Sequence, residues 1–368
     1  MKKALLLILT VAILAGVLSG CAAFLEDEYV SVQTHDASGS SGGTSTATIV
    51  ENYGEIKDAV MNLVERHYTY GVLRTYGYSG DVKKDVNKAC ADISVDTAIG
   101  AYAVYYIDCS VNQIVSYYEV QITITYKKTA DDVDSILDVS GDYTLKNALD
   151  NGMRKYLDTV TIRTDSAEIT ADYVTKMVKE LYYDDPTRSV VMPQVTVTEY
   201  PEGKKERIME ISFSYEYIKS KLGSMAQELA DVTRSVVGNI STSEDVTALR
   251  EACGILSDLS SYEKKATSAM SGTAYGALVK GLATDEGFAM AYKLLCDELS
   301  IDCVVVHGRL NSEDHVWNMV TLDGVTYHVD PSRYKELVDA VFLKTDEEMS
   351  SEYWWETEEL PASTYPVS

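Results

Sequence analysis

Asp285, His315 and Asp330 are of residue types that can carry acid–base or nucleophilic chemistry. Asp285 stands at the predicted N-terminus of a helix, where unpaired N–H groups and a partial positive charge stabilise an anion. His315 begins one predicted strand and Asp330 ends the next. A carboxylate beside an imidazole orients the ring and raises its pKa, and a ring held in this way can serve a neighbouring nucleophile.

Three predicted elements must position these residues. A helix is indicated by apolar residues at helical spacing, namely Phe288, Ala291, Tyr292, Leu295 and Leu299. Residues 301–306 predict a buried strand, and residues 315–320 and 325–330 predict a hairpin that turns at Asp323-Gly324. A helical region, 222–261, precedes them. The pattern places the helix terminus and the hairpin in one domain.

Short motifs surround each of the three residues. They are Asp285-Glu286-Gly287-Phe288-Ala289, His315-Val316-Trp317-Asn318 and Tyr327-His328-Val329-Asp330-Pro331-Ser332. In this order they resemble the transglutaminase-like family, a branch of the papain-like fold, over residues 262–354. The family has a nucleophilic Cys at the helix N-terminus, a His in the first strand and an Asp at the end of the second. The resemblance implies a papain-like domain with a catalytic triad, in which Gly287, Trp317 and Asn318 support the cleft.

The sequence departs from the family at the nucleophile, because Asp285 stands where the family has Cys. A helix N-terminus favours the reactive thiolate, and it also stabilises a carboxylate. A carboxylate is, however, a poor nucleophile towards an amide and forms no thioester. Cys296 lies eleven residues along the same helix, about 16 Å away at 1.5 Å per residue. Cys253 and Cys303 belong to other elements, so we expect all three to be ordinary buried thiols.

Three interpretations of Asp285 follow. In the first, Asp285 and His315 form a fixed ion pair that mimics thiolate and imidazolium, with Asp330 behind the ring and a raised His315 pKa. In the second, Asp285 is an ordinary acid in the first turn of a helix. A third interpretation makes Asp285 a general acid or covalent nucleophile assisted by His315.

A metal site is the remaining alternative for this region. His307, His315, His328 and Asp330 lie within 24 residues, and His and Asp are zinc ligands. Their spacing fits no zinc motif, and the triad already accounts for His315 and Asp330. We therefore predict neither a metal nor another cofactor.

The N-terminus resembles a bacterial lipoprotein signal peptide. Lys2 and Lys3 precede an apolar run, 4–17, that is short for a membrane span, and Leu18-Ser19-Gly20-Cys21 follows. The resemblance implies removal of residues 1–20 and lipid on Cys21. Residues 21–50 are rich in Ser, Gly and Thr and predict a flexible linker. The protein should then be anchored by its lipid to the extracytoplasmic face of the cell membrane.

The charge balance limits the partners. The 368 residues hold 32 Lys and Arg against 57 Asp and Glu, for a net charge of −25. Removal of the signal peptide takes away two lysines and no acids. Nucleic acids bind proteins through clustered cations, so this acidity argues against a nucleic-acid partner.

The first half contains an internal similarity at an offset of 89 residues. Residues 120–126 and 209–215 both alternate apolar and polar side chains, which is the period of a strand. The same offset aligns predicted helices at 56–67 and 145–156. In each unit the sequence pattern predicts a helix, a strand, a second helix and then two strands. The later helices are 82–91 and 171–182, and the later strand pairs are 101–107 with 116–126 and 189–198 with 206–217.

These patterns predict an α+β protein with two tandem repeated α+β modules, 51–130 and 143–220, followed by a transglutaminase-like domain, 222–368. The missing thiol favours a catalytically inactive domain that binds peptide, protein or cell-wall material. One alternative is an active hydrolase or acyltransferase that works without Cys. The other is a purely structural surface protein, which predicts a closed cleft.

Overall fold

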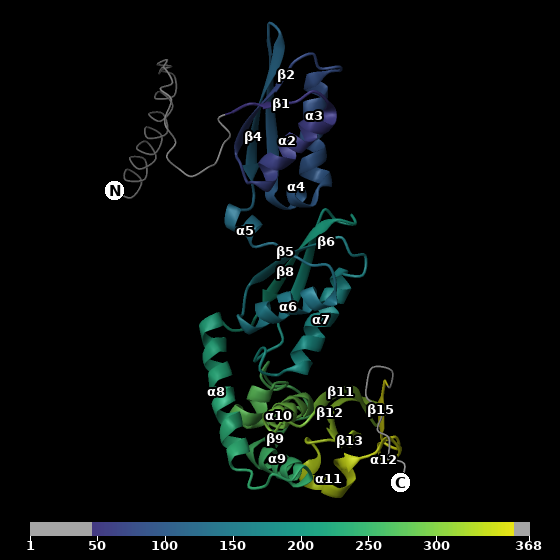
Figure 1. The fold of residues 1–368 in the computed structure, drawn as a ribbon. Helices are drawn as coiled ribbons and strands as arrows, with labels where there is room; N and C mark the ends of the chain where they lie inside the picture. The colour runs from purple at the N-terminus through teal and green to yellow at the C-terminus, as the bar shows by residue number, and fades with distance from the viewer. Residues whose placement is uncertain (1–45, 357–368) are drawn as a thin grey trace, which may run out of the picture. The chain divides into compact units, whose positions relative to one another are not determined.

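The computed structural model describes residues 46–356 of the chain (Figure 1). Residues 1–20, Cys21 and most of the linker expected from the sequence lie outside this range. Within 46–356, no helix combines the length and the apolar character needed to cross a membrane. The described chain mixes helices and sheets, as an α+β protein does.

The first unit is a four-stranded sheet with helices packed on it. The sheet has the order β1-β2-β4-β3, in which β1 and β2 are parallel and the other pairs are antiparallel. The strands are β1 (Thr48–Ile49), β2 (Tyr70–Thr75), β3 (Val104–Ile114) and β4 (Tyr117–Tyr126). The helices are α2 (Tyr53–Glu65), α3 (Val82–Asp96) and α4 (Ala98–Ala103). Ile56, Val60 and Leu63 form the buried face of α2, at the helical spacing seen in the sequence.

The strand predicted at 101–107 is wrong in its first half. Residues 98–103 form α4, and β3 begins only at Val104. Thr97 starts the helix, because its hydroxyl accepts the N–H of Gly100 at 3.2 Å. This side-chain cap favours a helical start at Ala98, directly before the strand.

The second unit repeats the strand order of the first. Its sheet has the order β5-β6-β8-β7, again with the first pair parallel and the others antiparallel. The strands are β5 (Leu137–Asp138), β6 (Thr159–Thr164), β7 (Gln194–Tyr200) and β8 (Arg207–Ser214), and the helices are α5 (Ala130–Asp134), α6 (Asp142–Arg154) and α7 (Ala171–Asp184). Leu73 pairs with Val120 and Ile162 pairs with Met209, so the offset of 89 residues also relates the two registers.

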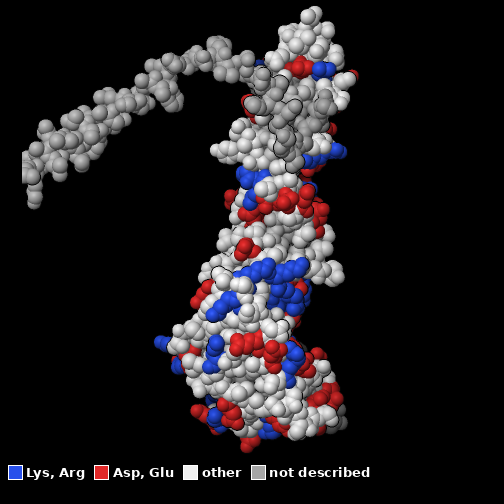
Figure 2. All heavy atoms as spheres, turned by 90° about the vertical axis from the view of Figure 1, so that its left-hand side faces the viewer, with Lys and Arg blue, Asp and Glu red and all other residues white. Residues whose placement is uncertain are grey.

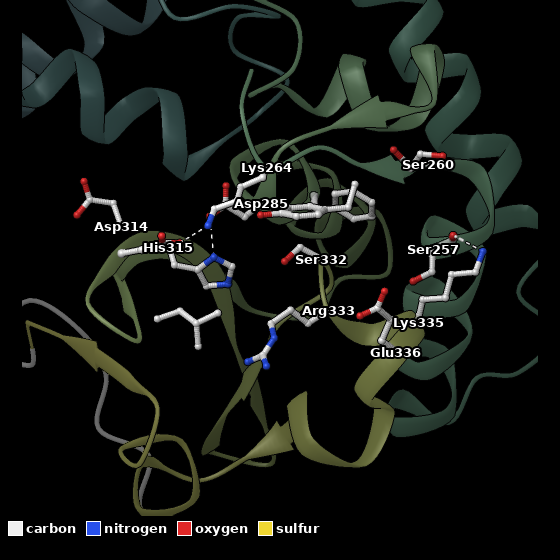
Figure 3. Close-up of a pocket in the computed structure, with 15 residues that line it drawn as sticks. Ser257, Ser260, Lys264, Asp285, Asp314, His315, Ser332, Arg333, Lys335 and Glu336 are labelled. Atoms are coloured by element: carbon white, nitrogen blue, oxygen red, sulfur yellow. Dashed lines mark hydrogen bonds and ion pairs between the residues drawn. The ribbon is translucent and has the colours of Figure 1, made fainter. Parts of the chain in front are cut away.

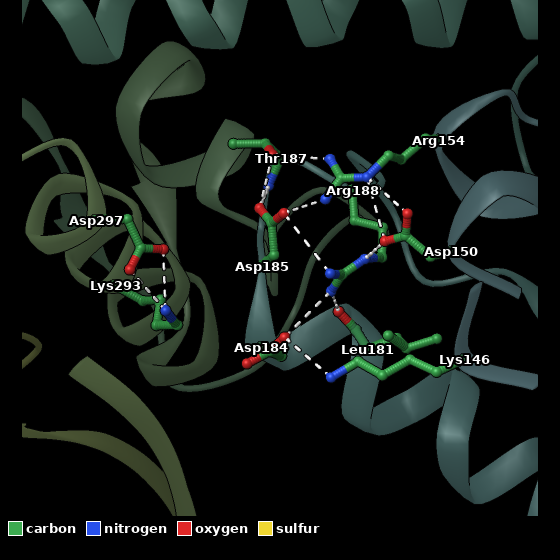
Figure 4. A network of polar contacts seen from close by, with 10 residues as sticks. All are labelled: Lys146, Asp150, Arg154, Leu181, Asp184, Asp185, Thr187, Arg188, Lys293 and Asp297. Atoms are coloured by element: carbon green, nitrogen blue, oxygen red, sulfur yellow. Dashed lines mark hydrogen bonds and ion pairs between the residues drawn. The ribbon is translucent and has the colours of Figure 1, made fainter. Parts of the chain in front are cut away.

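Buried Arg188 holds the helices of the second unit together (Figure 4). Its side chain is only 7% exposed and makes an ion pair with Asp150 of α6. It also lies 3.6 Å from Asp184 and 3.8 Å from Asp185, at the end of α7. Arg154 reaches the same Asp150 and Asp185. A buried guanidinium needs several acceptors, and these carboxylates supply them.

The C-terminal unit places helices around a five-stranded antiparallel sheet of order β14-β13-β12-β11-β15. The strands of this sheet are β11 (Cys303–Leu310), β12 (Glu313–Leu322), β13 (Val325–Val329), β14 (Phe342–Lys344) and β15 (Tyr353–Trp355). A separate two-stranded sheet pairs β9 (Ser261–Tyr262) with β10 (Leu282–Ala283). Its helices are α8 (Lys219–Gly238), α9 (Asp245–Leu259), α10 (Asp285–Glu298), α11 (Tyr334–Val341) and α12 (Asp346–Met349), with a π-helical turn at Gly276–Lys280. The hairpin β12–β13 turns at Asp323-Gly324, where both residues have positive φ.

Apolar side chains from the second and C-terminal units join in one buried cluster, which runs from Val139 to Phe342. A smaller cluster, which includes Val306, Trp317 and Trp355, belongs to the C-terminal sheet. On the face drawn in Figure 2, Lys and Arg side chains lie close beside Asp and Glu side chains.

Candidate functional site

Asp285 begins α10 and its carboxylate is held by two backbone N–H groups. Oδ1 accepts the N–H of Glu286 at 3.0 Å, and Oδ2 accepts the N–H of Val316, on β12, at 3.0 Å. The side chain is 19% exposed. The terminus of α10 therefore fixes the carboxylate in one orientation beside β12, as expected for an anion at a helix N-terminus.

His315 lies between two carboxylates, those of Asp285 and Asp330, and Figure 3 shows it beside Asp285. Its Nδ1 is 2.7 Å from Oδ2 of Asp285, and its Nε2 is 2.7 Å from Oδ2 of Asp330. A neutral imidazole has one donor nitrogen and one acceptor nitrogen, whereas the imidazolium has two donors. Both nitrogens face carboxylate oxygens, and the imidazolium can donate to both at once. The structure thus brings together the three residues that the sequence singled out.

The charges agree with this protonation state. Burial of the ring opposes protonation, but the hydrogen bonds to Asp285 and Asp330 outweigh burial and raise the pKa of His315 to about 9. Burial would likewise raise the pKa of Asp330, yet the hydrogen bonds from His315, Ser332 and Tyr353 hold it below its ordinary value. At neutral pH the site is a carboxylate, an imidazolium and a second carboxylate in a row.

Asp330 is fully buried and has further partners that the sequence analysis missed. Tyr353 donates its hydroxyl to Oδ2 at 2.7 Å, and the backbone and side chain of Ser332 donate to Oδ1 at 3.1 and 2.7 Å. Arg333 in turn donates to the Tyr353 oxygen at 2.7 Å. Pro331-Ser332 already lay in the third motif, but nothing in the sequence pattern pointed to Tyr353. This network holds the charge of Asp330 in the protein interior.

Trp317 and Asn318 act from behind the cleft and do not line it. Both are fully buried. Trp317 donates its indole N–H to Nδ1 of His328 at 2.9 Å, and Nε2 of His328 lies 2.8 Å from Asp346. Asn318 donates to the carbonyl of Ala289 at 3.0 Å, which ties β12 to α10. These contacts fix the strand that carries His315 relative to the helix that carries Asp285.

Gly287 stands where two backbone segments pass close to α10. A Cβ built there lies 2.4 Å from the carbonyl oxygen of Ser271 and 3.1 Å from that of Thr273. We expect Gly287→Ala to lower the free energy of unfolding by about 1–3 kcal/mol, because the backbone must shift to admit the methyl group. Gly254→Ala is the matched control in α9, where nothing lies within 4 Å, and it should stabilise the protein by up to about 1 kcal/mol. Urea unfolding of both variants tests this, and equal effects would contradict it.

An open cleft of about 580 Å³ lies above Asp285 and His315 (Figure 3). It is lined by hydroxyl, charged and apolar side chains from α9, β9, α10, β11, β12 and α11 and from the segments that connect them. They are Ser257, Ser260, Ser261, Tyr262, Lys264, Asp285, Phe288, Leu310, Glu313, Asp314, His315, Ser332, Arg333, Lys335 and Glu336. A ligand in this cleft would contact the ion pair directly.

The cysteines of this unit do not reach the cleft wall. Cys253, Cys296 and Cys303 are buried and unpaired by disulfides. Burial raises the pKa of Cys253 and of Cys296, which keeps both as inert thiols. None of the three stands at the N-terminus of α10, beside His315.

The histidines weighed as metal ligands have separate surroundings. His307 packs its ring against Tyr183 at 4.3 Å between ring centroids, and burial lowers its pKa to about 4. His328 contacts Trp317 and Asp346, whereas His315 contacts Asp285 and Asp330. Within residues 46–356, no three His, Cys, Asp or Glu side chains are grouped as metal ligands would be.

Solved structures of a TGase and of two candidate proteases align with this chain at low similarity. The TGase aligns with a TM-score of 0.30 and 8% identity, over 64% of this chain and 69% of that one. The candidate cysteine protease from Cytophaga hutchinsonii aligns with a TM-score of 0.26 and 12% identity, over 51% of this chain and 69% of that one. The candidate protease from Parabacteroides distasonis aligns with a TM-score of 0.21 and 8% identity, over 70% of this chain and 39% of that one. No family model and no curated protein matches the chain. Scores this low assign neither a fold nor an activity.

Proposed function

We propose that the C-terminal unit is a transglutaminase-like domain that has lost its nucleophile and binds a ligand in the retained cleft. The family assignment rests on the three motifs and on their meeting as a row of Asp285, His315 and Asp330. The ligand is peptide, protein or cell-wall material. The two preceding units are a duplicated α+β module that carries the domain.

The observation that carries this proposal is the occupation of both imidazole nitrogens by carboxylates. A general base needs a free lone pair on the ring, and an imidazolium with a pKa near 9 has none at neutral pH. Asp285 is equally engaged, since Oδ2 accepts from both His315 and the N–H of Val316. The carboxylate is thus stabilised as an acceptor, which opposes its use as a nucleophile.

An open cleft above the ion pair favours binding over a purely structural role, because a structural role predicts a filled groove. Peptidase and amine-incorporation assays on the purified chain test the proposal, which expects no turnover with either substrate class. Turnover that disappears in His315→Ala would establish the alternative of an active hydrolase or acyltransferase.

We further propose that the protein is a lipoprotein held on the extracytoplasmic face of the cell membrane. The support is the order of charge, apolar run and Cys21 in the first 21 residues. Cys21→Ser should abolish lipid attachment and release the protein from the membrane fraction, as measured by fatty-acid labelling and fractionation. A variant that stays labelled would contradict the assignment.

A further inference from the structure

One end of the cleft carries two serine hydroxyls without a hydrogen-bond partner among the described residues. Ser257 lies in the last turn of α9 and Ser260 follows its end, and they are 6% and 7% exposed. Both residues line the cleft, and Figure 3 shows them at the end away from His315. Buried polar groups in proteins are nearly always paired, and these two hydroxyl oxygens are neighbouring exceptions that a ligand in the cleft pairs once the serine side chains rotate towards it.

The hydrogen-bonding capacity of a serine hydroxyl determines which ligand groups can pair with it. Each serine has one donor and two acceptor sites, and rotation about one bond re-aims the oxygen. Ser261 and Ser332 add further hydroxyls to the same cleft. A ligand that both donates and accepts at closely spaced points, as a polyol does, matches this wall.

The charges of the cleft disfavour an anionic ligand. Each Lys or Arg side chain that lines the cleft already contacts a carboxylate. The pairs are Lys264 with Glu313 at 2.6 Å, Arg333 with Glu352 at 3.2 Å and Lys335 with Asp258 at 3.4 Å. His315 is likewise neutralised by its two partners. A carboxylate or phosphate ligand would therefore compete with a protein carboxylate for each of these cations, whereas an uncharged ligand would not.

An aromatic ring completes the surface. Tyr262 lines the cleft next to Ser260 and Ser261 and is 48% exposed, and its ring lies 6.4 Å from that of Phe288. The ring offers an apolar face beside hydroxyl groups. A pyranose has the complementary surface, with C–H groups on its faces and hydroxyls around its rim.

We propose that the cleft binds an uncharged saccharide, with a sugar ring on Tyr262 and sugar hydroxyls on Ser257 and Ser260. This inference rests on the proposed function, because it requires that the cleft be a binding site. It narrows the ligand from peptide, protein or cell-wall material to the glycan class.

Calorimetric titration of the purified full chain tests the inference. The probes are neutral tetrasaccharides of N-acetylglucosamine, glucose and xylose, with uncharged tetrapeptides as the comparison class. We expect at least one tetrasaccharide to bind and the double variant Ser257→Ala, Ser260→Ala to bind it at least about tenfold more weakly. The unliganded double variant should keep or raise its melting temperature, since it loses hydroxyls that were unpaired. Ser224→Ala, an exposed serine of α8, is the control and should bind as the wild type does.

Three results would overturn the inference. They are binding of tetrapeptides in place of saccharides, binding of neither class, and saccharide binding that survives the double substitution. The first leaves the proposed function standing, because the cleft would still bind a ligand. The turnover assay with His315→Ala decides the proposed function independently of which probe binds.

Discussion

Replacement of Asp285 by Cys is expected to give the cleft a nucleophile for covalent chemistry. The thiol would stand at the N-terminus of α10, where N–H groups stabilise a thiolate, and beside His315, which Asp330 already orients. We expect rapid alkylation of the new thiol by iodoacetamide and amine incorporation about 100-fold or more above the wild-type background. Mass spectrometry and a labelled-amine assay measure the two effects.

Asp314→Cys is the matched control for that variant. Asp314 precedes His315 in the chain and lines the same cleft, but it lies on β12 and its side chain is 98% exposed. Its thiol should react slowly and support no acyl transfer. If the Asp285→Cys thiol is no more reactive than the Asp314→Cys thiol in a folded protein, the site is not an assembled thiol-protease-like centre.

Replacement of Asp330 by Ala should be the most destabilising single change in the site. The substitution removes the group that accepts hydrogen bonds from His315, Tyr353 and Ser332. The His315 side chain, which is only 6% exposed, then keeps a single carboxylate partner. Breaking a buried ion pair from one side costs about 3–5 kcal/mol. Urea unfolding followed by circular dichroism should show a loss of this size in the free energy of unfolding.

Asp314→Ala serves as the control for stability. Its contact with Arg309 is 3.7 Å long and both side chains are largely exposed, so its removal should change the free energy of unfolding by less than about 0.5 kcal/mol. Equal losses in the Asp330→Ala and Asp314→Ala variants would mean that the buried network adds no more to the free energy of unfolding than an exposed contact does.

Local pattern was enough to predict the elements that carry the site. Apolar spacing and an acid at the first turn predicted the helix that the structure begins at Asp285, and Asp323-Gly324 predicted the turn of the β12–β13 hairpin. Short strands were missed, since two residues such as Thr48–Ile49 are too few for a strand period. The error at 101–107 arose because one capping hydroxyl, that of Thr97, decides between helix and strand.

The surroundings of Asp330 could not be predicted because they depend on a long-range contact. Tyr353 reaches Asp330 only after β15 folds back against β11, where Trp355 pairs with Gly308. A Cβ at Gly308 would lie 2.2 Å from the carbonyl oxygen of Trp354, so this close approach requires a glycine. Neither the pairing nor the glycine's role has a signature in the sequence around the three motifs.

The raised pKa of His315 links the ion pair to stability. A histidine whose folded pKa exceeds its unfolded value of about 6.5 stabilises the fold fully below pH 6.5. The contribution is lost as the pH rises through about 9, where the folded ring gives up its proton. The pKa of Asp330 is held below its ordinary value by its hydrogen bonds, so this carboxylate stays charged throughout the range.

A titration of the His315 ring by NMR, assigned with a His315→Gln variant, tests the ion pair most directly. A pKa close to 9, with both ring nitrogens protonated at pH 7, is the predicted result, because each nitrogen donates to a carboxylate 2.7 Å away. A pKa at or below about 6.5 would show a neutral ring able to act as a base, and it would contradict the account of an occupied, non-catalytic triad.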